Sequence, residues 1–200
     1  MQSFRIAKCN DCRDYHSLRR FNPEFSKSQP LSMNHTPILR DAETFDLPAV
    51  LDLNQAAVPH VSSVTLADME RFAEIAGYFR VAEVGGRVAG FLIALNPGHD
   101  YASDNYRWFN DNFDDFFYID RIVIADNAQG KGLGAALYQQ VILIAKAFAP
   151  RLTCEVNTQP PNPQSMAFHE GFGFKCVGTQ QTEGGNKEVA LLSLDFEPKA

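Results

Sequence analysis

The segment from residue 116 to residue 148 has the pattern of a strand, a glycine-rich turn and a helix in direct succession. Residues 116–126, FFYIDRIVIAD, are apolar, β-branched and aromatic, which is typical of a buried strand. The turn reads QGKGLGA at residues 129–135. Apolar residues then recur at helical spacing, at Leu133, Leu137, Val141, Ile144 and Phe148. The first turn of such a helix has backbone N–H groups without intrahelical partners, and glycines let a ligand approach them. The sequence therefore predicts an anion site, with a pyrophosphate as its natural occupant.

Several kinds of phosphate-binding loop contain glycines, and the flanking residues separate them. A P-loop needs a Ser or Thr directly after its Lys to hold Mg²⁺, but Lys131 is followed by a glycine, which excludes this loop. A dinucleotide-binding turn needs a third glycine, whose place is taken by Ala135. It also needs an acidic residue about 20 positions later, and Glu155 leaves this alternative open.

A third pattern, Gln/Arg-x-x-Gly-x-Gly/Ala between a strand and a helix, is met by Gln129, Gly132 and Gly134. A second motif accompanies it at residues 162–174, NPQSMAFHEGFGF, where Asn, a small residue, Phe and a final Gly-Phe are regularly spaced. Together the two motifs resemble the GCN5-related N-acetyltransferase (GNAT) superfamily. In that family the first motif binds acyl-CoA, and the second lies on the helix after the next strand. The family's usual Tyr is replaced here by His169.

The resemblance is strong over residues 118–174 and agrees in outline over residues 37–96. It implies an α/β GNAT fold, in which a mixed, mostly antiparallel sheet is splayed between strands four and five and has flanking helices. The local patterns predict a strand at residues 37–42, helices at 45–57 and from Ser63 or Thr65 to Gly77, and strands at 78–84, 88–95, 116–126, 152–156, 174–180 and 189–196. The second motif adds a helix after Asn162.

The length of 200 residues and the 45% hydrophobic content suffice for one domain with a sizeable core. We expect residues 34–197 to form a single N-acetyltransferase domain. Residues 1–33 show no sustained period, which predicts a disordered leader or a non-native start. The absence of a long apolar run and of a secretory signal favours a cytoplasmic protein.

Charge and cysteine content exclude several other functions. The formal net charge is −6, and Lys and Arg are not clustered, so we expect neither a nucleic-acid nor a membrane partner. Cys9, Cys12, Cys154 and Cys176 are too few and too scattered for a disulfide framework. Cys9 and Cys12 with His16 form at most half of a zinc site, so no metal is expected.

Residues 97–115 interrupt the expected order of elements as a long loop. Long loops inside compact domains are usually functional or disordered. This one combines aromatic side chains with carboxylates, a composition that fits a cationic amine. We expect Tyr106 and Trp108, together with Tyr118 on the next strand, to contact the substrate. The alternative is that the aromatic side chains form a satellite core or a dimer contact.

The resemblance implies how acetyl-CoA binds. Backbone amides of residues 130–135 bind the pyrophosphate, backbone groups of Ile122 and Ile124 pair with the pantetheine arm, and Asn162 hydrogen-bonds the arm from the other side. For Gln129 and Lys131 the alternative is that they are simply solvated polar side chains without a role in binding. The residues expected to hold acetyl-CoA are Ile122, Ile124, Gln129, Gly130, Lys131, Gly132, Leu133, Gly134, Ala135 and Asn162.

Acetyl transfer to an amine needs a base for the amine and a proton for the departing thiolate. Strand alternation predicts that Tyr118, Asp120, Ile122 and Ile124 share one face. Asp120 is the first candidate for the base, because an acid in an apolar strand is costly unless it is paired or lies in a wet cleft. Glu155 is the second candidate. For both residues the alternative is a structural ion pair.

His169 occupies the position at which the family's Tyr commonly protonates the CoA thiolate. A His donates a proton near neutral pH more readily than a Tyr does, so His169 is the candidate acid. The alternative is that it only packs beside the sulfur and that water supplies the proton. The expected activity is acetyl transfer from acetyl-CoA to a primary amine. The acceptor is a small molecule or a peptide, and a homodimer is possible by analogy. The alternative function is an acyl-CoA-binding or regulatory domain without turnover.

Overall fold

A computed structural model describes residues 36–197 of the chain. The predictions for residues 1–33, including Cys9, Cys12 and His16, fall outside this range. Within the described range, no helix is both long and apolar enough to cross a membrane. No group of three or more His, Cys, Asp and Glu side chains in the same range is arranged to hold a metal ion.

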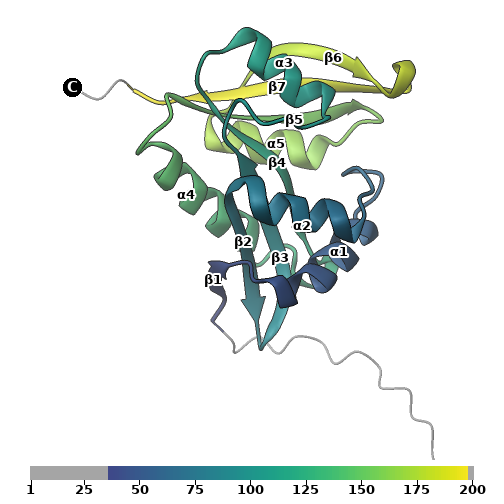
Figure 1. The fold of residues 1–200 in the computed structure, drawn as a ribbon, viewed down its shortest axis with the longest axis vertical. Coiled ribbons are helices and arrows are strands. Elements are labelled where there is room, and N and C mark those ends of the chain that lie inside the picture. The colour runs from purple at the N-terminus through teal and green to yellow at the C-terminus, as the bar shows by residue number, and fades with distance from the viewer. Residues whose placement is uncertain (1–35, 198–200) are drawn as a thin grey trace, which may run out of the picture. The chain divides into compact units, whose positions relative to one another are not determined.

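The fold is built on a seven-stranded sheet with the order β1-β2-β3-β4-β5-β7-β6 (Figure 1). Its strands are β1 Ile38–Asp41, β2 Ala76–Val84, β3 Arg87–Leu95, β4 Phe117–Ile124, β5 Arg151–Gln159, β6 Lys175–Thr182 and β7 Lys187–Asp195. The helices are α1 Leu47–Ala56, α2 Leu66–Ile75, α3 Asp104–Asn112, α4 Leu133–Ala145 and α5 Pro163–Phe172. Short 3-10 turns span Thr44–Asp46, Asp126–Ala128 and Glu183–Gly185. All neighbouring strands run antiparallel except β4 and β5, which confirms the predicted mixed, mostly antiparallel sheet.

The sheet opens between β4 and β5, as predicted. The two strands are paired only at Phe117 with Leu152 and at Tyr118 with Thr153. Beyond this point β5 continues along β7, while β4 continues along β3. The second half of β4 therefore has one edge without a partner strand in the described chain, and its backbone groups are free to bind something else.

Apolar side chains from the helices bury both faces of the sheet. On one face, Val50 of α1, Phe72 of α2 and Phe109 of α3 belong to a core that also contains Phe91 of β3. On the other face, Leu137 and other residues of α4 and α5 pack around Leu92, Ile119 and Phe174. Figure 1 shows α1 and α2 in front of β2 and β3, with α5 behind the sheet. Each fully buried aliphatic or aromatic side chain of this kind stabilises the fold by about 1.5–3 kcal/mol.

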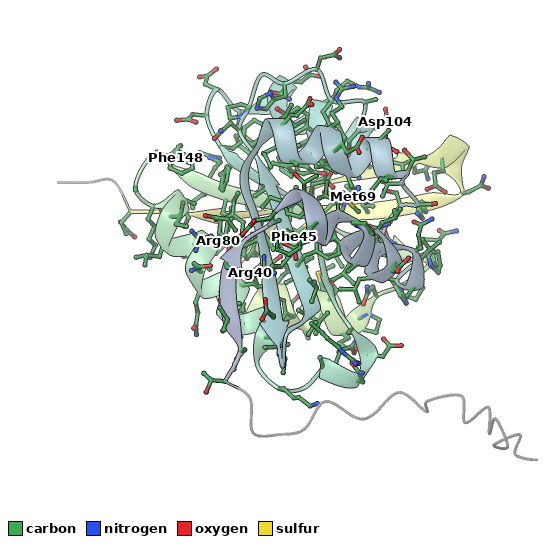
Figure 2. The ribbon with its side chains drawn as sticks, turned by 60° about the horizontal axis from the view of Figure 1, so that its bottom comes forward. Arg40, Phe45, Met69, Arg80, Asp104 and Phe148 are labelled. Atoms are coloured by element: carbon green, nitrogen blue, oxygen red, sulfur yellow. The ribbon has the colours of Figure 1, made fainter. Side chains whose placement is uncertain are left out.

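Arg40 ties the edge strand β1 to the start of α1. Its guanidinium forms ion pairs with Asp46 at 2.6 Å and with Glu83 at 3.0 Å. It also lies over the Phe45 ring, 5.5 Å from the ring centroid, and these two side chains are labelled in Figure 2. The hydrogen bond from Arg40 lowers the pKa of Asp46, so this pair stays charged at neutral pH.

The predicted end of the second helix is wrong, although its start is confirmed. Thr65 caps α2, because its hydroxyl accepts from the Asp68 N–H at 3.2 Å and the Asp68 carboxylate accepts from the Thr65 N–H at 2.7 Å. The helix ends at Ile75, and Gly77 lies inside β2 at a shift in register. A Cβ at Gly77 would lie 2.8 Å from the Asn96 side chain, so close packing explains this glycine.

Two further predictions are corrected by the structure. Helix α4 ends at Ala145, so Phe148 lies outside it, half exposed, with its ring 5.0 Å from that of Phe117. The expected loop at residues 97–115 contains helix α3. Ser103 caps α3, since its hydroxyl accepts from the Tyr106 N–H at 3.3 Å. The apolar residues of α3 are few, so packing against the sheet rather than local pattern stabilises the helix.

Candidate active site

A cleft of about 480 Å³ lies where β4 and β5 diverge. Residues 119–122 of β4 and 154–157 of β5 line its centre. The α1–α2 connection at residues 60–64 and the start of α3 at residues 101–105 line one side. Tyr138 of α4, together with Asn162, Ser165 and His169 at and along α5, lines another. The cleft therefore exists because the sheet splits, and it collects side chains from elements that are distant in sequence.

A β-bulge at Asp120 changes which residues of β4 face the cleft. Ile119 is paired with Ala94 and Arg121 with Ile93, so Asp120 is an extra residue without a partner on β3. Tyr118 and Val123 belong to the core beneath α1–α3, whereas Ile119 belongs to the core beneath α4 and α5, against which Ile122 and Ile124 pack. The predicted common face of Tyr118, Ile122 and Ile124 is therefore wrong, because one inserted residue shifts the alternation by one.

Asp120 is held in a buried ion pair. One carboxylate oxygen accepts from Arg121 Nε at 2.5 Å, and the other accepts from the Tyr101 hydroxyl at 2.5 Å. The Asp120 and Arg121 side chains are each 3% exposed. Arg121 also donates to Asn54 Oδ1 at 2.8 Å and to the Ser62 carbonyl at 3.3 Å. This is the structural ion pair that the sequence left open for Asp120, and it ties β4 to the α1–α2 connection.

Glu155 has the properties of a base at neutral pH. Its carboxylate accepts from the Tyr118 hydroxyl at 2.8 Å and from Asn105 Nδ2 at 3.0 Å. Burial, reinforced by the negative charge of Asp120, raises the pKa of Glu155 to about 7, although both hydrogen bonds act in the opposite direction. Glu155 lies in the wall of the cleft, so it combines access with a pKa suited to proton transfer near neutrality.

Both ring nitrogens of His169 are engaged. Nδ1 lies 2.7 Å from the Ser165 carbonyl, which can only accept, so Nδ1 carries the proton. Nε2 then accepts from the Tyr138 hydroxyl at 2.5 Å. Burial lowers the pKa of His169, which keeps the ring neutral. His169 and Tyr138 both line the cleft, but in this arrangement His169 directs no N–H into it.

The glycine-rich turn presents free backbone donors. Gly130 and Gly132 have φ of 71° and 80°, a conformation that favours glycine, and Gly132 precedes the first residue of α4. No described residue accepts a hydrogen bond from the backbone N–H groups of residues 130–135. These groups lie at the positive end of the α4 dipole, so the turn has the geometry of an anion site.

Side-chain hydrogen bonds to backbone carbonyls hold this turn in place. Gln129 Nε2 donates to the Ile124 carbonyl at 3.2 Å, and Lys131 Nζ donates to the Asn127 carbonyl at 2.7 Å.

Asn162 caps α5, because its Oδ1 accepts from the Ser165 N–H at 3.1 Å. Its Nδ2 has no acceptor among the described residues and is available in the cleft.

The structure brings some of the predicted site residues together and separates others. Asp120, Ile122, Glu155, Asn162 and His169 line the cleft. The turn at residues 129–135 and Ile124 lie outside this lining, although the cleft reaches α4 at Tyr138, about 7.5 Å along the helix from its first residue.

The three predicted substrate contacts do not line the cleft. Tyr106 is fully buried, and its hydroxyl donates to the Asn96 carbonyl at 2.5 Å. Trp108 packs against β6, where a Cβ at Gly178 would lie 2.9 Å from its ring. Tyr118 is also fully buried and holds Glu155. Tyr106 belongs to the core beneath α1–α3 and Trp108 packs against it, which is the kind of packing role that the sequence left open as the alternative for this loop.

Sequence reasoning did not assign Asn105 or Tyr138 to the site, and it gave Tyr101 and Arg121 no specific contact in it. None of the four belongs to a motif, and each makes at least one contact with a distant element. For Tyr138 a weak signal existed, because it is a polar tip on the apolar face of the helix that follows the turn.

Comparisons with known proteins agree with this geometry. The model of the acetyltransferase (GNAT) family matches residues 47–174. The N-acetyltransferase structure from Staphylococcus aureus Mu50 is 24% identical, covers 80% of this chain and 98% of its own, and has a TM-score of 0.61. The ribosomal-protein-S18-alanine N-acetyltransferase from Escherichia coli is 19% identical, with coverages of 82% and 97% and a TM-score of 0.63. The Salmonella typhimurium protein yncA, solved with its cofactor acetyl-CoA, is 22% identical, with coverages of 82% and 96% and a TM-score of 0.61. At these identities the solved structures show likeness of fold. A comparison with curated proteins finds no significant match.

Proposed function

Because the chain belongs to the acetyltransferase (GNAT) family, we propose that it transfers an acetyl group from acetyl-CoA to a primary amine. The observation that carries the proposal is Glu155, a carboxylate with a pKa of about 7 in the wall of the cleft between the diverging strands. A base poised at neutral pH is what deprotonation of an ammonium group requires. Glu155 takes the role of base in this proposal. Asp120 is held by Arg121, and its negative charge helps to raise the pKa of Glu155.

The described residues fit acetyl-CoA. The free N–H groups of residues 130–135 match a pyrophosphate, and the open edge of β4 at Ile122 and Ile124 can pair with the amides of a pantetheine arm. Asn162 can donate from the opposite side through its free Nδ2. When bound, acetyl-CoA supplies the thioester. Glu155 accepts the proton that the acceptor amine loses as its nitrogen bonds to the acetyl carbon and the carbon–sulfur bond breaks.

The charge of the cleft indicates the class of acceptor. Carboxylates outnumber cations in its lining, where Asp68, Asp104 and Glu183 join the central acids and Lys187 is the nearest counter-charge to Glu183. A positively charged amine is attracted to such a cleft and repelled from a basic one. The related enzyme from Escherichia coli acts, by its name, on a protein alanine. We therefore propose a cationic amine, carried either by a small molecule or by a peptide.

An acceptor screen tests this function. The full chain is incubated with acetyl-CoA and spermine, tyramine, kanamycin, a peptide beginning with Ala, or a peptide with an internal Lys, and free thiol is measured. We expect thiol release above the rate without acceptor for at least one amine, with an acetylated product detected by mass spectrometry. Binding of acetyl-CoA without acceptor-dependent release would support a non-catalytic binding domain. Absence of acetyl-CoA binding by calorimetry would overturn both functions.

Substitution of Gly132 tests the pyrophosphate cradle. We expect Gly132→Ala to weaken acetyl-CoA binding about tenfold. An L residue in this left-handed conformation costs about 1–2 kcal/mol, so the turn relaxes and its N–H groups no longer converge on the anion. Gly86→Ala in the β2–β3 turn is a matched control, because Gly86 has φ of 75° and, as at Gly132, an added Cβ meets nothing within 4 Å. The control should leave the Kd measured by calorimetry unchanged. Equal weakening in both variants would contradict the cradle.

The geometry around His169 favours the packing role rather than the acid role, with water supplying the proton to the thiolate. We therefore expect His169→Phe, at saturating acetyl-CoA, to retain kcat within about threefold and to keep the pH profile, whereas loss of a general acid lowers rates by about 10²–10⁴-fold. The free energy of unfolding should fall by about 1–3 kcal/mol, because the Tyr138 hydroxyl loses its partner. A loss in kcat of a hundredfold or more, on the order expected for an acid, would restore the acid role.

A further inference from the structure

The segment between β3 and β4 holds both carboxylates at the centre of the cleft. Tyr101 donates to Asp120 at 2.5 Å, and Asn105 donates to Glu155 Oε1 at 3.0 Å. Figure 2 labels Asp104, the first residue of α3, next to Asn105 in the chain. Neither contact is part of the two sequence motifs, which lie in α4 with its preceding turn and in α5. The inserted segment therefore contributes directly to the surroundings of the proposed base.

A second hydrogen bond sets the orientation of the Asn105 amide. Gln180 Nε2, from β6, donates to Asn105 Oδ1 at 3.3 Å. Because Oδ1 can only accept and Nδ2 can only donate, this contact turns the Asn105 N–H group toward Glu155. The chain from Gln180 through Asn105 to Glu155 thus joins the outer strand of the sheet to the wall of the cleft.

We propose that Asn105 is a positioning residue that holds Glu155 and favours its ionised form, so that the carboxylate can accept a proton. The inference rests on the proposed function for its catalytic meaning, but the contact itself can be tested without turnover. A donor directed at a carboxylate stabilises the charged form and not the protonated one. Removing the donor therefore raises the pH at which Glu155 ionises.

Other charged and titratable groups face Glu155 from every neighbouring element. The pKa of Glu155 is raised by the charge of Asp120 and lowered by the Tyr118 hydrogen bond and the charge of Arg121, all three on β4. Cys154 of β5 and Tyr138 of α4 are buried, and the charge of Glu155 helps to raise the pKa of both groups. The same cleft is also lined by His169 of α5, by Tyr101 and Asp104, which precede Asn105 in the chain, and by Glu183 and Lys187 near the β6–β7 turn. Among the described residues, Asn105 and Tyr118 donate hydrogen bonds directly to Glu155, so Asn105→Ala removes one donor without changing a formal charge.

The test measures the ionisation of Glu155 by ¹³C NMR of full-length protein labelled at Glu carboxyl carbons, with the resonance assigned by its absence in Glu155→Gln. In Asn105→Ala we expect the midpoint to rise by about one pH unit. The isosteric Asn105→Asp, which removes the donor and adds a negative charge, should raise it at least as far. Gln180→Ala should give a smaller rise. Asn112→Ala is the matched control, since Asn112 is exposed on the same helix and donates only to the Trp108 carbonyl.

The same variants give a second readout in the acetyl-transfer assay. A rise of about one unit lowers the rate about fivefold at pH 7 and little at pH 9. A midpoint in Asn105→Ala and Asn105→Asp equal to that of the wild type overturns the inference, whatever the activity. A raised midpoint in a protein that transfers no acetyl group leaves the contact established and overturns the proposed function instead. The two failures are therefore distinguishable.

Discussion

Glu155→Gln is expected to lower kcat/KM for the amine by about 10²–10⁴-fold, the usual contribution of a general base. Gln has the shape of Glu and keeps one oxygen, which can accept from Asn105, while its NH2 group can donate to the Tyr118 hydroxyl, but it cannot take a proton from the acceptor. The Kd for acetyl-CoA, measured by calorimetry, should stay unchanged, because Glu155 is not expected to contact the pyrophosphate or the pantetheine arm.

The pH dependence provides a sharper version of this prediction. In the wild type the rate should rise with pH through about pH 7, since the base acts only when ionised and burial raises the pKa of Glu155 to about 7. This rise should vanish in Glu155→Gln. Glu188→Gln is a matched control on the adjacent strand β7, where the Glu188 carboxylate accepts from Thr158 and does not line the cleft. If Glu155→Gln kept both the wild-type rate and its increase with pH, another group would have to be the base.

Stability should change in the opposite direction to activity. The folded protein binds a proton at Glu155 more tightly than the unfolded chain does, so stability falls as pH rises from the ordinary Glu pKa of 4.5 to the folded value of about 7. Above this window the loss is complete. Glu155→Gln should therefore raise the free energy of unfolding by up to about 3 kcal/mol at pH 8 relative to its effect at pH 4. Such a gain would exclude misfolding as the cause of lost activity.

Arg121→Met should lower the free energy of unfolding by about 3–5 kcal/mol. The change leaves the Asp120 carboxylate, which is 3% exposed, buried without its cation. It also removes the donor to Asn54 and the contact of the guanidinium with the Phe72 ring, 4.9 Å away. Denaturant unfolding followed by circular dichroism measures the loss. Because Arg121 ties the α1–α2 connection to β4, KM for the amine should rise more than KM for acetyl-CoA.

A double-mutant cycle identifies the cause of this loss. If the unpaired charge dominates, Asp120→Asn combined with Arg121→Met should be less destabilised than Arg121→Met alone. Arg80→Met is the control, because Arg80 pairs at 2.8 Å with Asp41, whose side chain is 80% exposed, and such surface pairs contribute about 0–1 kcal/mol. Equal losses for Arg121→Met and Arg80→Met would contradict the buried-pair argument.

Local sequence was sufficient for the parts of the fold that depend on short-range chemistry. The hairpin turn at Gly85-Gly86 and the turn before α4 require left-handed backbone, and glycine is the residue that adopts it readily. Thr65 caps α2 through a bond that spans three residues. The period of the apolar residues placed β4 and α4 for the same reason, because neighbours along an element determine its buried face.

Errors arose where a contact crosses between elements. The bulge at Asp120 exists only as a mismatch between β3 and β4, and it shifted the predicted faces of β4 by one residue. Helix α3 has a polar local sequence, and its aromatic side chains become a core only when they meet the sheet. Gly77 resembled a helix stop, but the side chains of Asn96 and Phe117 explain it.

By itself, then, the sequence determined the GNAT family, the fold class and the turn predicted to hold a pyrophosphate, because these depend on motifs and periods that are short in the chain. Tertiary structure alone placed the two acids in different surroundings. Asp120 is ion-paired with Arg121 and accepts from the Tyr101 hydroxyl, while Glu155 is buried beside the charge of Asp120 with two donors from other elements. The pKa of a carboxyl depends on burial, on nearby charges and on hydrogen bonds, and for Glu155 the charge of Asp120 and the donors Tyr118 and Asn105 all come from other elements.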